Sequence, residues 1–593
     1  MLKTTSTIFV VLTVWFTSGT LKSTTVMNRV GQSDPDFELY ADNLVDDDDD
    51  DLHEVNTDCG PVQGKRFSKK VYDKTNPVDV YEFRNIPYAQ APVGALRWRP
   101  PVRLSKDKST CWKGTLKYEE KKVVACKQNW PKRRPIPQTE DCLVVTVRTP
   151  SLKKDAKLPV MVWIHGGGMV YGYNEMYAYH PDNEFSAQMD VVTVSINYRL
   201  GVFGFMSLKE LWVNSGPDES YGNYGIMDQI EALKWVQTNI ENFGGDPNNV
   251  ALYGESGGGT AIYCLLGSPL TKGLFQKASP ASGAPRIRST RAESDKKYRS
   301  VIQKTNCQKA TDGETAKCLQ DFDTDKLLTF FKNTPTLTYQ WQFPTNTPYK
   351  GYPLEIIDPI VVTKSPEQIQ GSKDHPVELL IGNCAQEIGP FPGKIAPDVN
   401  LTTWDKLKKD LQPKMDSFQT GLYPMALKAY LAEEKDPKQN FTSQYIYEVM
   451  STDALVICTT NQAASHLSKQ QDVFTVSRLI FSQPPSKIIG LHLETAYHGW
   501  DSVVLFGIKF FHHGPIPAKE QKLIEKLRAF YKDFFWGDKN MAQYRGKTTD
   551  FWAGDAHTTG GIESYHRDEC KMWEAAGLFT HSWGDLGKPA AVC

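Results

Sequence analysis

From about residue 56 onward, short apolar runs alternate with stretches in which apolar residues recur at helical spacing. The runs at residues 160–164 and 191–197 predict buried strands. Between residues 226 and 240 apolar side chains recur every three or four positions, which predicts a helix that ends at a glycine- and proline-rich turn. Residues 249–253 predict a further strand, after which helical spacing resumes. This alternation is typical of the α/β class, in which helices cover both faces of a large, mostly parallel twisted sheet.

The composition is that of a globular protein. Of 593 residues, 40% are apolar, 23% charged and 11% aromatic, whereas disordered chains contain few aromatic residues. After residue 16 no apolar run approaches the roughly 20 residues needed to span a bilayer, so we expect no integral membrane segment. Neither an internal repeat nor a linker divides the chain. We therefore predict one large α/β domain with long insertions over residues 56–575, followed by a tail over 576–593.

The N-terminal region differs from the rest of the chain. Lys3 precedes an apolar core at residues 8–16 and then small residues, which predicts a secretory signal peptide over residues 1–20. Residues 21–55 predict a disordered acidic leader, because residues 1–54 contain eleven acidic and three basic residues. The chain's net charge of −1 therefore divides into −8 for this segment and +7 for the body. Basic residues in the body are scattered, which argues against a nucleic-acid partner.

The cysteines and two short motifs favour an extracellular location. Eleven cysteines fit an oxidising compartment. Asn400 and Asn440 lie in Asn-X-Thr motifs and are candidate glycosylation sites. The last residues resemble neither a retention signal nor a lipid-anchor signal. We therefore predict a secreted glycoprotein.

Residues 254–258 read Gly-Glu-Ser-Gly-Gly, the G-x-S-x-G pattern of a serine nucleophile. The pattern is short, and a plain glycine-rich loop is the alternative. Here it follows a predicted strand and precedes a predicted helix, the context in which such a serine stands exposed on a strained turn. We therefore predict that Ser256 is a catalytic nucleophile.

A second glycine-rich segment, His165 followed by three glycines, comes directly after the predicted strand at 160–164. Glycines let the backbone approach a substrate closely and direct N–H groups at a developing oxyanion. We expect the amides of Gly167, Gly168 and Gly257 to form this oxyanion hole. A phosphate-binding loop is the alternative, but no Lys-Ser/Thr step follows, and we expect neither a cofactor nor a metal. His165 is expected to pack rather than to catalyse.

Together with further ordered blocks, these motifs resemble the type-B carboxylesterase and cholinesterase family of α/β-hydrolases. The blocks occur in the family's order over roughly residues 56–575: Phe83-Arg-Asn-Ile-Pro-Tyr-Ala89, Pro92-Val-Gly94 with Arg97, Glu140-Asp-Cys-Leu143, Asn197-Tyr-Arg-Leu-Gly201, Asn223-Tyr-Gly225 and Phe243-Gly-Gly-Asp-Pro247. The resemblance implies the α/β-hydrolase fold and hydrolysis of carboxylic esters through an acyl-enzyme.

The resemblance also implies the two partners of the nucleophile. The family's acid lies in a Gly-x-x-x-x-Glu segment after a strand, and Glu387 matches this register. The family's histidine precedes a Gly-x-acid step and an apolar run ending in Phe-Gly, which His498 matches and His492 does not, although by sequence alone either is possible. His498 would then take the Ser256 proton, and Glu387 would orient the imidazole.

The resemblance implies three disulfides as well: Cys126–Cys142, Cys307–Cys318 and Cys458–Cys570. Cys59 and Cys111 could form a fourth, on parity alone. Cys264 and Cys384 are expected to be buried thiols. Cys593, the last residue, resembles the terminal cysteine of dimeric cholinesterases, so a disulfide-linked homodimer and a free terminal thiol both stay open.

The residues expected around the ester are Glu255, Trp130 and Phe391. A choline esterase needs an aromatic wall for the quaternary ammonium, and the family's choline-site tryptophan lies in the first of these disulfide loops. Trp130 lies in this loop, but the loop is short, and Pro390 stands where cholinesterases have a gorge residue. The body is also net positive, whereas an acidic field gathers cations. We therefore predict a general carboxylesterase for neutral, partly apolar esters, with a cholinesterase as the alternative.

A non-catalytic adhesion protein is a further alternative, because some relatives of this fold have lost the serine and act through their surfaces. Such relatives lack a member of the triad, whereas Ser256, Glu387 and His498 are all present. A lipase would need an apolar lid, which the sequence does not reveal. The sequence therefore favours a secreted serine esterase that acts on a small-molecule ester.

Overall fold

The computed structural model describes residues 51–577 except 73, 106–108, 130–135, 177–178, 213–219, 221, 288, 333–353, 389–398, 434–441, 486–495, 508–515 and 553. Several predicted features lie outside the described residues: the signal peptide at 1–20, the leader up to residue 50, nearly all of the tail, Trp130, Phe391, Asn440, His492 and Cys593. The last residues assigned to the leader belong instead to strand β1 (Leu52–Thr57), in which Val55 and Thr57 are buried against the sheet.

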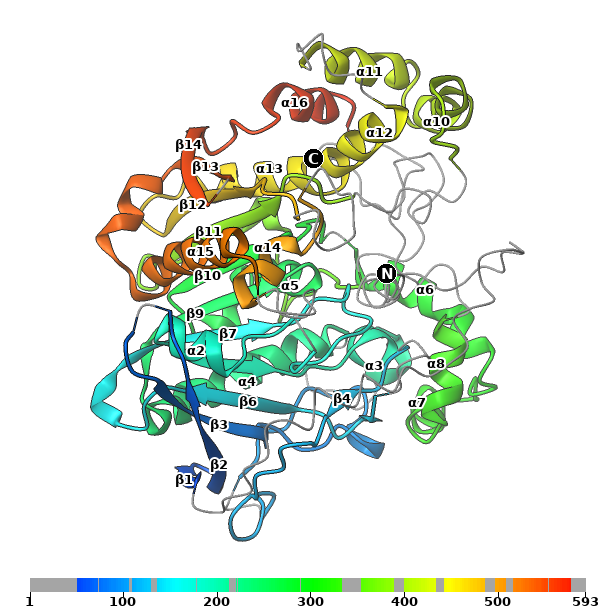
Figure 1. Cartoon of the computed structure of the whole chain (residues 1–593). Coiled ribbons are helices and arrows are strands. Elements are labelled where there is room, and N and C mark those ends of the chain that lie inside the picture. The colour runs from blue at the N-terminus through cyan, green and yellow to red at the C-terminus, as the bar shows by residue number, and fades with distance from the viewer. Residues whose placement is uncertain are drawn as a thin grey trace, which may run out of the picture.

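Within the described residues, twelve strands form one sheet (Figure 1). The central strands are parallel and the outer ones antiparallel, as the sequence pattern predicts for a mostly parallel sheet. In spatial order the strands are β1, β2 (Gly60–Lys69), β3 (Val78–Pro87), β6 (Val144–Thr149), β8 (Val192–Ile196), β7 (Leu158–Ile164), β9 (Gly245–Glu255), β10 (Lys277–Ala281), β11 (Val377–Cys384), β12 (Phe474–Phe481), β13 (Lys547–Trp552) and β14 (Asp555–Gly561). A separate two-stranded sheet pairs β4 (Ala125–Cys126) with β5 (Gln138–Thr139).

Helices cover both faces of the sheet. In β7, Val160, Val162 and Ile164 pack into one apolar cluster, while Met161 and Trp163 pack into another. The first cluster includes side chains of α4 (Tyr224–Asn239) and α5 (Gly257–Leu266), and the second includes those of α2 (Asn183–Met189), α14 (Trp500–Phe506) and α15 (Ala518–Trp536). Because successive side chains of a strand point to opposite faces, the two clusters lie on opposite sides of the sheet.

The predicted elements near the first motifs are confirmed, with one difference in length. The strands predicted at 160–164 and 191–197 are β7 and β8, and the helix predicted at 226–240 is α4. The strand predicted at 249–253 is β9, which begins four residues earlier, at Gly245. It starts there because Gly245 pairs with Leu158 of β7 across an irregularity in the register. Residues 246–249, Asp-Pro-Asn-Asn, had hidden this pairing, because such a sequence predicts a turn.

Two helical insertions lie between consecutive strands of the sheet. The first, between β10 and β11, contains α6 (Arg291–Gln303), α7 (Asp312–Gln320) and α8 (Thr324–Lys332). The second, between β11 and β12, contains α10 (Trp404–Phe418), α11 (Leu422–Glu433), α12 (Ser443–Thr452), a π-helical turn (Asp453–Ile457) and α13 (Cys458–Ser468). Figure 1 shows α10, α11 and α12 together with α16 (Arg567–Ala575) at one end of the molecule, where they share a third apolar cluster. Among the described helices, none combines the length and apolar composition needed to cross a bilayer.

Four disulfides join the described cysteines: Cys59–Cys111, Cys126–Cys142, Cys307–Cys318 and Cys458–Cys570. They are the three pairs implied by the resemblance and the pair suggested by parity. Cys264 and Cys384 are buried free thiols. The longest loop, closed by Cys458–Cys570, links α13 to α16 across 112 residues of sequence.

Candidate active site

Ser256 occupies the turn between β9 and α5 and has a φ of 57° and a ψ of −120°. Residues other than glycine rarely adopt a positive φ, so the backbone of this turn is strained. Neighbouring glycines permit it: a Cβ at Gly258 would stand 2.0 Å from the Ile164 carbonyl oxygen, and one at Gly254 would stand 2.6 Å from the Gly258 carbonyl oxygen. The turn therefore packs directly against the end of β7 and holds Ser256 at the carboxyl ends of the central strands.

His498 lies between Ser256 and Glu387. Its Nε2 is 2.9 Å from Ser256 Oγ, and its Nδ1 is 2.6 Å from Glu387 Oε2. The loops that carry the imidazole and the carboxylate are joined directly, because the Gln386 N–H donates to the Ala496 carbonyl at 3.0 Å. The three predicted triad side chains are thus brought together in the order hydroxyl, imidazole, carboxylate.

The Glu387 carboxylate is fixed by its own loop at the end of β11. Its Oε1 accepts hydrogen bonds from the Cys384 N–H at 3.0 Å and from Asn383 Nδ2 at 3.1 Å. The Glu387 N–H donates to Thr452 Oγ1 at 3.1 Å. Because these donors occupy Oε1, the other oxygen is left to hold the His498 ring in one orientation.

The segment that contains Gly167 and Gly168 lies against Gly257, the residue after Ser256. A Cβ at Gly257 would stand 2.8 Å from the Gly168 nitrogen, so the two backbone segments lie in contact. Within the part of the chain that the structure describes, none of the three N–H groups has a hydrogen-bond acceptor. Such converging free donors at the N-terminus of a helix can stabilise a developing negative charge.

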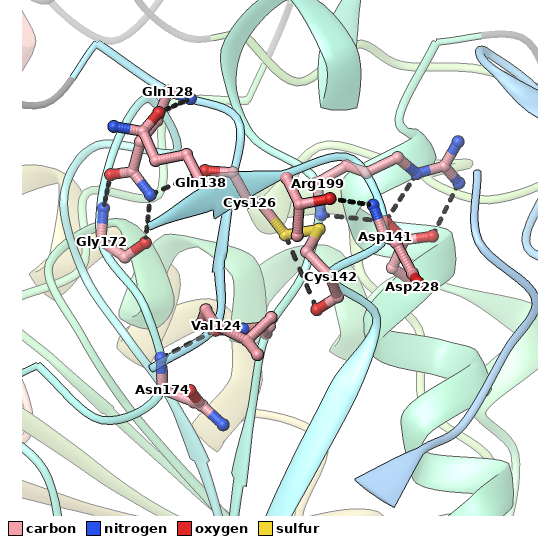
Figure 2. The surroundings of a disulfide bond; sticks show 12 residues. Val124, Cys126, Gln128, Gln138, Asp141, Cys142, Gly172, Asn174, Arg199 and Asp228 are labelled. Atoms are coloured by element: carbon pink, nitrogen blue, oxygen red, sulfur yellow. Dashed lines mark hydrogen bonds and ion pairs between the residues drawn. A yellow bond between two sulfur atoms is a disulfide. The ribbon is translucent and has the colours of Figure 1, made fainter. Parts of the chain in front are cut away.

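The segment after these glycines is braced by a disulfide loop (Figure 2). Gln128, which follows the Cys126–Cys142 bridge, donates from Nε2 to the Gly172 carbonyl at 2.8 Å and accepts from the Gly172 N–H at 2.7 Å. The Val170 N–H in turn donates to the Gly167 carbonyl at 3.1 Å. The disulfide loop therefore limits the movement of the backbone that carries the predicted oxyanion donors.

His165 is part of the packing, as the sequence analysis expects. Its ring is buried, stacks on Tyr198 with ring centroids 4.5 Å apart, and directs Nδ1 at the Gly166 carbonyl at 2.8 Å. Burial lowers the pKa of His165 to about 4, since desolvation disfavours the charged ring. His165 is therefore neutral at physiological pH.

Two further buried carboxyl groups, Glu255 and Asp501, adjoin the triad. Glu255 Oε1 is 3.3 Å from His498 Nε2. Burial raises the pKa of Glu255 to about 8 against the attraction of His498, and burial followed by repulsion from Glu387 raises that of Asp501 to about 6. For His498 burial favours the neutral ring, but Glu255 and Glu387 outweigh it and raise its pKa to about 9. Protonation of Glu255 removes the largest attraction that raises the pKa of His498. Glu255 and His498 therefore titrate as a pair.

The structure thus brings together most of the predicted site residues: Ser256, His498, Glu387, Gly167, Gly168, Gly257 and Glu255. The predicted pocket residues Trp130 and Phe391 lie outside the described residues. Sequence reasoning missed Asn383, Thr452 and Gln128, which hold the acid and the oxyanion loop. The sequence signal that could have identified these three residues is a polar side chain close to a motif. This signal is weak, because most polar side chains face solvent.

Comparison with known proteins agrees with this geometry. The model of the Carboxylesterase family matches residues 51–554. The chain is 31% identical to Carboxylesterase 1E of Rattus norvegicus, over 81% of this chain and 85% of the relative, and 30% identical to Liver carboxylesterase of Sus scrofa, over 81% and 84%. Among solved structures, a PNB esterase superposes with a TM-score of 0.66 at 25% identity and covers 87% of this chain and 99% of its own. The chain therefore belongs to the carboxylesterase family, has the α/β-hydrolase fold, and is a carboxylic ester hydrolase.

Proposed function

We propose that the protein is a secreted serine esterase that hydrolyses neutral, partly apolar carboxylic esters through an acyl-enzyme on Ser256. One observation supports this most directly: His498 lies within 2.9 Å of the Ser256 hydroxyl and 2.6 Å of the Glu387 carboxylate. A hydroxyl so aligned can lose its proton to the imidazole as it attacks. The family assignment agrees with this chemistry.

In the proposed reaction, His498 Nε2 accepts the Ser256 proton while Oγ forms a bond to the ester carbonyl carbon. The carbonyl electrons move to its oxygen, which the amides of Gly167, Gly168 and Gly257 stabilise by about 3 kcal/mol for each donor in comparable sites. Collapse of this intermediate breaks the bond to the alcohol oxygen, which takes the proton from the imidazolium. Water then repeats the sequence on the acyl-enzyme and releases the carboxylic acid.

Glu387 is assigned the role of orienting His498 and stabilising the imidazolium form. Its Oε2 accepts from Nδ1, which leaves Nε2 as the basic nitrogen that faces Ser256. Glu255 is assigned to the same site as a buried acid that shares protons with His498 rather than as a ligand for substrate.

The proposed substrate class follows from the body's net charge of +7 and from the relatives, which are named carboxylesterases. A positive body does not concentrate choline esters. The proposed secretion is supported by four disulfides, which persist in oxidising compartments. Glycosylation at Asn400 is compatible with its exposed position, and glycosylation at Asn440 and a homodimer through Cys593 stay predictions.

Turnover of a chromogenic short-chain ester tests the proposal. We expect the wild type to release the chromophore and Ser256→Ala to lose nearly all activity. Ser186→Ala is a matched control, because Ser186 is a buried serine on α2 whose hydroxyl donates to the Val191 carbonyl, and it should keep wild-type turnover. A folded but inactive wild type would favour the non-catalytic adhesion alternative. A panel of choline, aliphatic and aryl esters then decides the substrate class, and a preference for choline esters would favour the cholinesterase alternative.

A further inference from the structure

Arg478 is a buried cation in the interior of the sheet, close to the triad but not in contact with it. It lies on β12, where it pairs with Ile381 of β11, and its side chain is fully buried. Its guanidinium donates to two amide oxygens, Asn383 Oδ1 and Asn461 Oδ1. Within the described residues no carboxylate lies within ion-pair distance of it, and Nε has no acceptor. Burial lowers the pKa of Arg478 to about 10, so the group remains charged at neutral pH.

The contact with Arg478 determines which way the Asn383 amide faces. An amide can present either its oxygen or its NH₂ group to a neighbour, but a guanidinium only donates. Arg478 therefore selects Oδ1 of Asn383, and the NH₂ group must face the other way. There, Nδ2 donates to Glu387 Oε1 at 3.1 Å. Without the guanidinium, rotation of the amide would put its oxygen against the carboxylate, which is repulsive.

The other amide anchors the guanidinium to the helical end of the molecule. Asn461, on α13, uses Oδ1 to accept from Arg478 at 2.8 Å. Its Nδ2 donates to the Tyr565 carbonyl at 2.8 Å and lies 3.6 Å from Cys570 Sγ, one of the sulfurs of the Cys458–Cys570 bridge. Both amides that accept from Arg478 are thus held in one orientation by their other contacts.

We propose that Arg478 is a positioning residue for ester hydrolysis, which acts through Asn383 to keep a hydrogen-bond donor and a positive charge directed at the Glu387 carboxylate. The inference rests on the proposed role of Glu387. The buried charge is otherwise difficult to explain, because a desolvated cation without a carboxylate in contact is costly and an apolar residue would fit a strand interior. The guanidinium acts on Glu387 through one amide, so that its positive charge and the Asn383 donor both face the carboxylate that orients His498.

The proposal has a definite consequence for the pH profile. The ionisable groups that act on Arg478 are Tyr263 on α5, Tyr565 and Glu387, and both tyrosines are neutral because burial raises their pKa values. Removing Arg478 takes away a positive charge and weakens a hydrogen bond to Glu387. Both changes stabilise the imidazolium of His498, so its pKa rises. In a plot of kcat against pH, the limb on which kcat rises should therefore move to higher pH.

The first experiment compares Arg478→Met with Arg299→Met. Arg299 lies on α6 and is partly buried, and its guanidinium bonds Asp295 and Glu210, neither of which belongs to the triad or to the Cys126–Cys142 loop. Both variants should lose stability. Active sites are counted by titration with a fluorophosphonate ester, so that only folded enzyme is compared. We expect Arg478→Met to lower kcat about tenfold with little change in KM and to move the rising limb upward by about half a pH unit. Arg299→Met should keep the wild-type kcat and limb.

A second variant keeps the proposal testable if Arg478→Met does not fold. Asn383→Asp gives Arg478 a carboxylate partner and so should preserve folding, but it places an anion against Glu387. We expect its kcat to fall at least tenfold and its rising limb to move upward, and Asn383→Ser, which retains a donor, to recover part of the loss. Suppose that either variant unfolds at a lower temperature and still keeps the wild-type kcat and the wild-type pH dependence of kcat. In that case Arg478 has only a structural role and the proposal fails. Inactive wild type would instead refute the proposed function.

Discussion

Glu255 Oε1 lies 3.3 Å from His498 Nε2, the same ring nitrogen that contacts the Ser256 hydroxyl. The proposed base therefore faces both the proposed nucleophile and a second acid. Within the described residues Glu255 Oε1 has no hydrogen-bond partner, so this oxygen interacts with the imidazole chiefly through its charge. The ionisation of the buried acid thus controls how readily the base holds a proton.

We expect Glu255→Gln to move the rising limb of kcat/KM to lower pH. An ionised Glu255 stabilises the imidazolium and raises the pKa of His498, so removing the charge lowers this pKa and leaves the base neutral at lower pH. The pH dependence of kcat/KM for a neutral ester measures the shift. Glu355→Gln is the matched control, because Glu355 is another fully buried carboxyl group that bonds to no triad residue. A midpoint unchanged in Glu255→Gln would contradict this coupling.

Glu355 itself should make stability depend on pH. Its side chain is fully buried, and burial raises the pKa of Glu355 from 4.5 to about 7, because desolvation disfavours the ionised carboxylate. The folded state therefore binds a proton on Glu355 more tightly than the unfolded state does. The resulting contribution to the free energy of unfolding is fully present below pH 4.5 and is lost as the pH rises to 7. The shift corresponds to about 3 kcal/mol of free energy of unfolding.

In Glu355→Gln this loss should be absent. Its unfolding free energy relative to the wild type should rise between pH 4.5 and 7 and stay constant above that range. Chemical denaturation at a series of pH values measures the difference. Parallel curves for the two proteins would show that Glu355 is not protonated in the folded state.

Gln128 should matter for activity although it lies outside the triad. Gln128→Leu leaves the N–H and carbonyl groups of buried Gly172 without their partner, at a cost of about 2 kcal/mol. It also loosens the segment that carries the oxyanion donors, so kcat should fall more than KM changes. Gln237→Leu is the control, since Gln237 likewise bonds two backbone groups, the Pro247 and Leu274 carbonyls, but far along the chain from this loop. Equal kcat values in the two variants would contradict the bracing role.

The parts of the site that could be predicted from sequence are those fixed by local structure. The turn at Ser256 needs glycines within two residues and a strand and helix on either side, and all of these are adjacent in the chain. Glu387 and His498 are different, because they lie 131 and 242 residues from Ser256 along the chain. No local rule brings such residues together, so only the resemblance to a family could identify them.

The residues that sequence reasoning missed are polar side chains inside the core. Arg478 and Glu355 belong to residue types that normally lie at the surface, so an interpretation based on expected exposure assigns them no role. Their burial depends on which strands become neighbours, as when β12 pairs with β11 and sets Arg478 near Asn383. The same holds for the start of β9, where Gly245 joins the sheet because Leu158 of β7 provides a partner, whereas residues 246–249 are not paired with β7.

Gly257→Ala should separate the oxyanion hole from the rest of the site. The added Cβ would stand 2.8 Å from the Gly168 nitrogen and 2.9 Å from that of Met169, and these are backbone atoms that cannot move aside by rotating a bond. The two segments must separate, so the amides of Gly168 and Gly257 can no longer converge on one oxygen. Losing one such donor lowers kcat by about 100-fold or more in comparable enzymes, and we expect a loss of at least this size.

The triad should remain assembled in this variant, because neither Glu387 nor His498 contacts the altered backbone in the hydrogen-bond chain. Phosphonylation of Ser256 should therefore slow without disappearing, while turnover of the chromogenic ester falls. Gly313→Ala serves as the control, since a Cβ at that position of α7 meets no atom within 4 Å and alanine is the better helix former. Wild-type turnover in Gly257→Ala would mean that the three amides do not form the oxyanion hole.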